Sequence, residues 1–203
     1  MLAVPLVAFT CLLVAGIAGA TFAVAGYAQY AKDLPDPRQA FDAIVFTRQT
    51  KVWDRSGKVL LAVFGTDRRD LVKYEDIPPE LVDATTAIED KTFWENTGFD
   101  PMGFVSAALD TLEGRPRGGS TITQQLVRDR LLPKEYVSVD ANPYEKKVRE
   151  IIQAIRLTEA YPGAEGKQTI MEKYLNQNFY GNRSYGVAAA AESYWKKELS
   201  ELT

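Results

Sequence analysis

The 203-residue chain has no histidine and only one cysteine, Cys11. Without histidine, the chain cannot form a Ser-His-Asp or Cys-His catalytic pair, a histidine zinc site or a histidine proton shuttle. A single cysteine allows neither an internal disulfide nor a multi-cysteine metal cluster. Proton transfer near neutral pH therefore falls to carboxylate, lysine or tyrosine side chains.

Charge is also missing from the start of the chain, since all 24 basic and 27 acidic side chains lie at or beyond Lys32. An apolar stretch longer than roughly 20 residues can span a bilayer, so the sequence predicts a transmembrane helix over residues 1–31. A cleaved signal peptide is the alternative, because small residues fit a cleavage site. No Lys or Arg precedes the stretch, so charge leaves its orientation open. The net charge of -3 predicts no nucleic-acid binding.

The rest of the chain divides into a linker over residues 32–50, stiffened by Pro35 and Pro37, and a folded domain over residues 51–203. Two apolar runs around a turn at residues 54–57 predict a β-hairpin over residues 52–64. Helical spacing dominates from Pro78 onward. Prolines and N-cap residues predict helix starts near Pro78, Asp100, Ser120 and Asn142, the last with Glu145 in a capping box, and two further helices cover residues 167–175 and 186–197.

The first motif, EDKTFWENTG, covers residues 89–98. It places Glu89 and Asp90 near Phe93, and desolvation beside an aromatic ring can raise a carboxyl pKa toward that of a general base. Acidic residues at a solvated helix end are the alternative interpretation.

The second motif, GGSTITQQ, covers residues 118–125. Two glycines before a Ser120 N-cap would leave the amides of residues 120–122 uncovered at a helix N-terminus, where anions bind. An ordinary helix start is the alternative. The flanking side chains that could add hydrogen bonds to an anion are Arg115, Arg117, Gln124, Gln125 and Arg128.

Two more motifs lie on later helices. In EKKVREIIQAI, Lys146, Lys147 and Glu150 share a helical face, although a surface ion-pair ladder explains the same spacing. In KQTIMEKYLNQNFYG, most apolar residues fit core packing, with Glu172 and Asn176 four residues apart.

In this order, the four motifs resemble the peptidoglycan glycosyltransferases of family 51, found in class A penicillin-binding proteins and monofunctional transglycosylases. The resemblance covers roughly residues 74–197. Asn96 stands where the family has histidine, Ser106 where arginine is common, and Arg128 and Asp129 where lysine and asparagine are usual. The resemblance implies an α-rich, lysozyme-like fold with a hydrophobic jaw near residues 99–104, and a module that continues past Thr203.

The resemblance further implies that the chain polymerises glycan, transferring the lipid-pyrophosphate-linked growing chain to the 4-hydroxyl of lipid II with inversion. Glu89 would be the general base, and Glu150 a second catalytic residue that orients cations or holds Mg²⁺ or Mn²⁺; no organic cofactor is implied. The substrate-binding residues would be Asp90, Phe93, Asn96, Ser120, Thr121, Gln124, Gln125, Arg128, Lys146 and Lys147.

Such an enzyme would be a single-pass protein of the cell membrane with its catalytic domain on the extracytoplasmic face. Its partners would be lipid II, the growing glycan chain and proteins of cell-wall synthesis or division. Two alternatives stay open: a lysozyme-like glycan cleaver, and a non-catalytic lipid II-binding scaffold, which the changes at Asn96 and Ser106 motivate.

Overall fold

The computed structural model describes residues 3–115 and 117–202; for residues 3–13, 15 and 23 it describes the backbone only. The prediction of a mainly α domain with one small hairpin is confirmed for this part of the chain. Its elements are α1 (Ala3–Ala31), α2 (Pro37–Asp42), β1 (Thr50–Trp53), β2 (Leu60–Phe64), α3 (Pro79–Glu89), α4 (Pro101–Leu112), α5 (Ile122–Arg130), α6 (Lys134–Val137), α7 (Pro143–Ala160), α8 (Gly163–Gln177) and α9 (Val187–Trp195), with short 3-10 helices at Tyr74–Asp76 and Leu199–Glu201.

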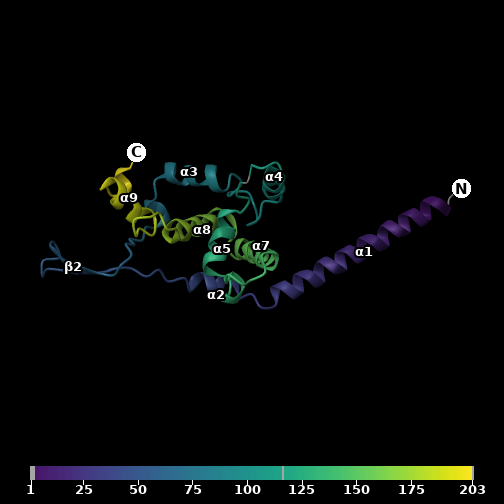
Figure 1. Ribbon diagram of the computed structural model, residues 1–203, viewed down its shortest axis with the longest axis horizontal. Coiled ribbons are helices and arrows are strands. Elements are labelled where there is room, and N and C mark those ends of the chain that lie inside the picture. The colour runs from purple at the N-terminus through teal and green to yellow at the C-terminus, as the bar shows by residue number, and fades with distance from the viewer. Residues whose placement is uncertain (1–2, 116, 203) are drawn as a thin grey trace.

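Helix α1 projects away from the rest of the molecule as one continuous helix (Figure 1). Its 29 residues give it a length of about 43 Å at 1.5 Å per residue. Over the residues that the structure describes, no helix combines the length and apolarity needed to cross a membrane. The predicted anchor over residues 1–31 lies partly outside the described residues and stays a prediction.

The predicted hairpin is confirmed, and it projects on the side opposite α1 (Figure 1). Strands β1 and β2 are antiparallel, with Val52 opposite Ala62 and a shift in register after Val52. The Asp54 carboxylate closes the turn by accepting hydrogen bonds from the Ser56 hydroxyl and the Val59 amide. These bonds, the one from Ser56 above all, lower the pKa of Asp54 to about 2.

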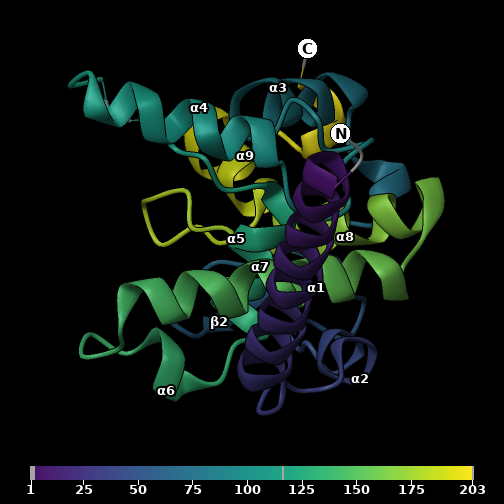
Figure 2. The ribbon, with the colours of Figure 1, turned by 90° about the vertical axis from the view of Figure 1, so that its right-hand side faces the viewer.

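The core lies where α5 packs against both α7 and α8 (Figure 2). Apolar side chains of the three helices meet there, because apolar residues at helical spacing line one side of a helix. Helix α5, which carries the second motif, is therefore held from two sides. The fully buried apolar side chains of these three helices include Ile122, Leu126, Leu157, Ile170, Met171 and Leu175.

The start of the predicted linker belongs to the folded domain, so that part of the prediction is wrong. Leu34 and Phe41 are buried, and the Phe41 ring lies 4.7 Å from the Tyr161 ring. The ammonium of Lys173 donates a hydrogen bond of 2.9 Å to the Phe41 carbonyl. Large apolar residues on either side of Pro35 and Pro37 bury surface that a free linker would leave in water.

Two predicted helix starts are confirmed. Asp100 caps α4 by accepting a bond from the Gly103 amide, and Asn142 caps α7 by accepting from two amides. The predicted capping box at Glu145 is wrong, because the Glu145 carboxylate pairs with Arg149 at 2.8 Å instead. The ion pair lies one helical turn along the same face, where residues four apart meet.

Candidate functional site

The end of α3 separates the two adjacent carboxylates of the first motif. Glu89 is the last residue of the helix and is exposed, whereas Asp90 is its C-cap and only 6% exposed. The backbone leaves the helix at Asp90, with φ of -160°. The two neighbouring carboxylates therefore lie in different surroundings, Glu89 at the surface and Asp90 in the interior.

Asp90 fastens the start of α5 to the end of α3. Its carboxylate accepts hydrogen bonds from Asn96 Nδ2 at 2.9 Å and from the Ile122 amide at 3.1 Å. Burial raises the pKa of Asp90, and these two hydrogen bonds oppose that effect. The carboxylate is engaged within the protein, although Asp90 also lines a hollow beside Glu89. Its predicted contact with substrate stays a prediction.

Asn96 joins Asp90 to a buried lysine. Its Oδ1 accepts from Lys167 Nζ at 3.2 Å, and its backbone carbonyl accepts from the same ammonium at 2.8 Å. The ammonium also lies 4.8 Å from the centre of the Phe93 ring. Burial lowers the pKa of Lys167 to about 8. Phe93 is fully buried, so Phe93 and Asn96 support the site from behind rather than lining it.

Thr121, not Ser120, caps helix α5, and the predicted cap is therefore wrong. The Thr121 hydroxyl accepts from the Gln124 amide at 3.1 Å, and Gln124 Oε1 accepts from the Thr121 amide at 2.8 Å. This reciprocal pair is a capping box, which needs Thr and Gln three residues apart. Gln124 is fully buried in this arrangement, and its position does not support the predicted contact with substrate.

The predicted open anion site at the start of α5 is wrong for two of its three amides. The Thr121 amide is bonded to Gln124, and the Ile122 amide is bonded to Asp90. A negative side chain of the protein itself thus occupies the position that the helix dipole makes favourable for an anion.

The third motif meets the second at Glu150, which is 2% exposed. Lys147 Nζ donates to Glu150 Oε1 at 2.6 Å and to the Ser120 hydroxyl at 2.8 Å. Arg128 Nη1 lies 3.8 Å from the other oxygen of Glu150. Glu150 therefore holds two cations, Lys147 on its own helix and Arg128 on α5. Lys146 is half-buried and forms no ion pair with the described residues.

Glu89 is oriented through a chain of two hydrogen bonds. Gln125 Nε2 donates to Glu89 Oε2 at 2.9 Å, and Gln125 Oε1 accepts from the Tyr174 hydroxyl at 3.2 Å. Burial raises the pKa of Tyr174 to about 12, so the hydroxyl keeps its proton and fixes which end of the amide faces Glu89. The sequence predicts Tyr174 as a core residue, and the structure confirms this. Its contact with Gln125 could be found from its hydroxyl, because a buried hydroxyl needs a hydrogen-bond partner.

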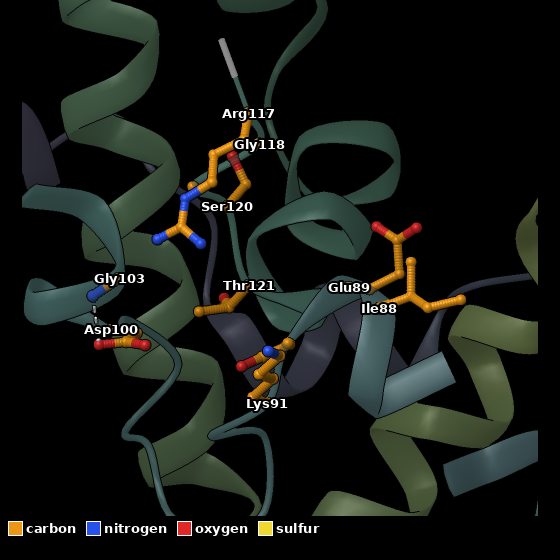
Figure 3. Close-up of a pocket in the computed structure, with 11 residues that line it drawn as sticks. Ile88, Glu89, Lys91, Asp100, Gly103, Arg117, Gly118, Ser120 and Thr121 are labelled. Carbon is orange, nitrogen blue, oxygen red and sulfur yellow. Dashed lines mark hydrogen bonds between the residues drawn. The ribbon is translucent and has the colours of Figure 1, made fainter. Parts of the chain in front are cut away.

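Residues of the site surround three hollows of about 140, 440 and 210 Å³, which share lining residues. Figure 3 shows the first of them. Arg117 and Ser120 line all three, and Glu89 lines the first two. Arg128 lines the second hollow and Lys147 the third. We call these hollows together the cleft.

Residues 56–203 match the family model described as transglycosylase. The chain belongs to the transglycosylase family. It is 39% identical to penicillin-binding protein 1A of Vibrio cholerae over 94% of the chain and 22% of that protein. It is 37% identical to the protein of that name from Rickettsia typhi, over 86% of the chain and 21% of the relative. The chain thus spans about a fifth of these relatives' length, and the resemblance seen in the motifs is confirmed at the level of the family.

A divalent metal does not fit the side chains around Glu150 in this transglycosylase domain. Both carboxylate oxygens face cations, from Lys147 and Arg128. No group of three His, Cys, Asp or Glu side chains that could hold a metal occurs among the described residues. A metal at Glu150 would have to displace an ammonium, and we derive no step of the reaction through one.

Helix α4 of the transglycosylase domain carries the residues predicted for a hydrophobic jaw. Met102 is 79% exposed and Phe104 is 38% exposed. The Phe104 ring lies 5.8 Å from the ring of Phe99, which is half-buried. Phe104 also lines the third hollow, so this apolar surface borders the cleft.

Proposed function

We propose that this domain polymerises peptidoglycan glycan chains from lipid-pyrophosphate-linked disaccharides, with lipid II as the acceptor. One observation carries the proposal. The exposed carboxylate of Glu89, oriented by Gln125, shares a hollow with the cation of Arg128. A base on one side and positive charge on the other suit transfer from a phosphate leaving group.

In the proposed reaction, Glu89 takes the proton of the acceptor 4-hydroxyl as that oxygen attacks the anomeric carbon of the growing chain. The bond from this carbon to the pyrophosphate oxygen breaks, and the lipid pyrophosphate departs with the negative charge. Attack from the face opposite the leaving group inverts the configuration. Pyrophosphate needs positive charge rather than a strong acid, and Arg128 and Lys147, held by Glu150, supply it.

We further propose that the segment over residues 1–31, which includes α1, anchors the domain as a single membrane span, with the domain on the extracytoplasmic face. The uncharged sequence before Lys32 and the exposed apolar side chains of α4, such as Met102, support this proposal. Both would keep the cleft at the bilayer surface, where lipid-linked substrates lie. Proteins of cell-wall synthesis or division remain proposed partners.

The cleft favours transfer over cleavage of finished glycan. A lysozyme-like cleaver needs a protonated acid beside the scissile bond. Besides Glu89, the carboxylates that line the first hollow are Asp90 and Asp100. Both are engaged within the protein, because Asp90 accepts from the Ile122 amide and Asp100 from the Gly103 amide and the Thr92 hydroxyl. Cations line the cleft instead, and they suit a phosphate leaving group.

The test is polymerisation of labelled lipid II by the full chain in detergent. Glu89→Gln removes the base and keeps the size of the side chain, so we expect at least about a 100-fold loss of rate. The control is Glu80→Gln, an exposed change at the other end of α3, which should keep the wild-type rate.

Three outcomes would contradict the proposal. If wild type polymerises and Glu89→Gln matches Glu80→Gln, Glu89 is not the base. If wild type binds lipid II without turnover, the chain is a scaffold. If it releases fragments from finished peptidoglycan, it is a glycan cleaver.

A further inference from the structure

The loop before α5 carries two arginines, and the structure separates their roles. Arg117 lines all three hollows of the cleft. In Figure 3 its side chain extends from the loop toward Gly103 and Asp100. Arg115 lines none of these hollows; it pairs with Glu113 and lies 3.8 Å from Asp110. Arg115 and Arg117 therefore carry the same charge, but only Arg117 lies in the cleft.

Arg117 is held in place by α4. Its Nε lies 2.8 Å from Asp110 Oδ2, and its Nη2 donates to the Ser106 hydroxyl at 2.7 Å. The side chain remains 52% exposed. A guanidinium has five N–H donors, and these contacts occupy two of them, which leaves donors for a ligand. The two anchors lie one helical turn apart on α4, so they fix the direction of the guanidinium.

Other groups around the cleft are less available to an anion. The amides of Thr121 and Ile122 at the start of α5 already have partners within the protein. Lys147 and Arg128 both face Glu150, which neutralises part of their charge. Asp110 does the same for Arg117, but the Arg117 side chain is 52% exposed, against 32% for Arg128 and 28% for Lys147.

From this placement we infer that Arg117 binds a phosphate oxygen of the lipid-pyrophosphate substrate. The inference rests on the proposed function and adds a binding residue to it. A guanidinium matches two oxygens of a phosphate at once, and Arg117 is the cation shared by all three hollows among the described residues. Ser106 acts as a positioning residue, since its hydroxyl contacts the guanidinium.

The experiment compares Arg117→Gln with the matched control Arg115→Gln in the full chain, using labelled lipid II in detergent. Loss of one charge-assisted contact should raise KM about tenfold for Arg117→Gln and leave kcat within about twofold. Arg115→Gln should keep both constants. Arg117→Lys should recover part of the loss, and Ser106→Ala should raise KM by less than Arg117→Gln because the charge remains.

Competition by a polyprenyl pyrophosphate without sugar or peptide identifies the anion. Inhibition of Arg117→Gln should need about ten times more of it than inhibition of wild type. Unchanged inhibition with a raised KM for lipid II would overturn the inference, because the arginine would then contact a carboxylate of the peptide. Equal constants for Arg117→Gln and Arg115→Gln would overturn it too. If wild type fails to polymerise lipid II, the proposed function itself fails.

Discussion

Lys167 offers a test of the buried network behind the cleft through the pH dependence of stability. The residue is 4% exposed, and its ammonium bonds to Asn96 beside the Phe93 ring. The perturbation is Lys167→Met, which keeps an unbranched side chain and removes the charge. The prediction concerns the slope of the free energy of unfolding against pH.

The magnitude follows from the pKa of Lys167, which burial lowers from 10.5 to about 8. At 1.36 kcal/mol per pKa unit, this difference corresponds to about 3 kcal/mol. Between these two values the unfolded chain binds a proton that the folded chain has lost, so the free energy of unfolding rises with pH. Below about pH 8 both states are protonated, and the full cost of burying the charge is present.

The assay is urea unfolding of wild type and Lys167→Met at pH values from about 7 to about 11. Wild type should gain stability relative to the variant as pH rises from about 8, toward a limit of about 3 kcal/mol near pH 10.5. Tyr174, whose pKa is raised to about 12, is present in both proteins and cancels in the difference. Parallel curves for the two proteins across this range would refute the reasoning.

Three further changes test the site and its supports. Tyr174→Phe should lower kcat about threefold to tenfold without raising KM. It removes the hydrogen bond, worth about 1 kcal/mol, that holds the Gln125 amide in its orientation toward Glu89. Steady-state polymerisation kinetics measure this change. Gly98→Ala should cost more than about 2 kcal/mol by urea unfolding, since a Cβ there would lie 2.3 Å from a carbonyl of α7 at φ +92°. Thr121→Ala should cost about 1 kcal/mol through the lost cap, and Thr121→Ser should restore most of it.

Local features could be predicted from the sequence because local chemistry fixes them. Asp100 and Asn142 cap α4 and α7 as expected, since an N-cap needs only its own side chain and amides two or three residues ahead. At the start of α5 the same reasoning chose Ser120. Thr121 forms the cap instead because Gln124 closes the box and Gly98, 23 residues earlier, accepts a bond from its hydroxyl.

The sequence could not predict that Glu89 is exposed and Asp90 buried, because this difference depends on contacts with residues distant in the sequence. Asp90 lies in the interior, where its carboxylate accepts a hydrogen bond from the Ile122 amide, 32 residues later in the chain. Phe41 joins the core through Tyr161, although prolines nearby suggested a linker. Motif patterns thus indicated which residues gather around the site, but long-range packing determined which of them face the cleft.

The joint between α1 and α7 has a mechanical consequence. Arg149 is 3% exposed, donates to the Tyr30 carbonyl at 2.6 Å, and stacks over the Tyr136 ring at 3.9 Å. Arg149 directly precedes Glu150 on α7. Its contacts therefore hold α1 in a fixed position relative to α7, the helix that carries Glu150. If α1 is fixed in a bilayer, these contacts set the angle at which the cleft meets the lipid surface. One residue inserted before Tyr30 would rotate the α1 segment ahead of it by about 100° relative to the cleft.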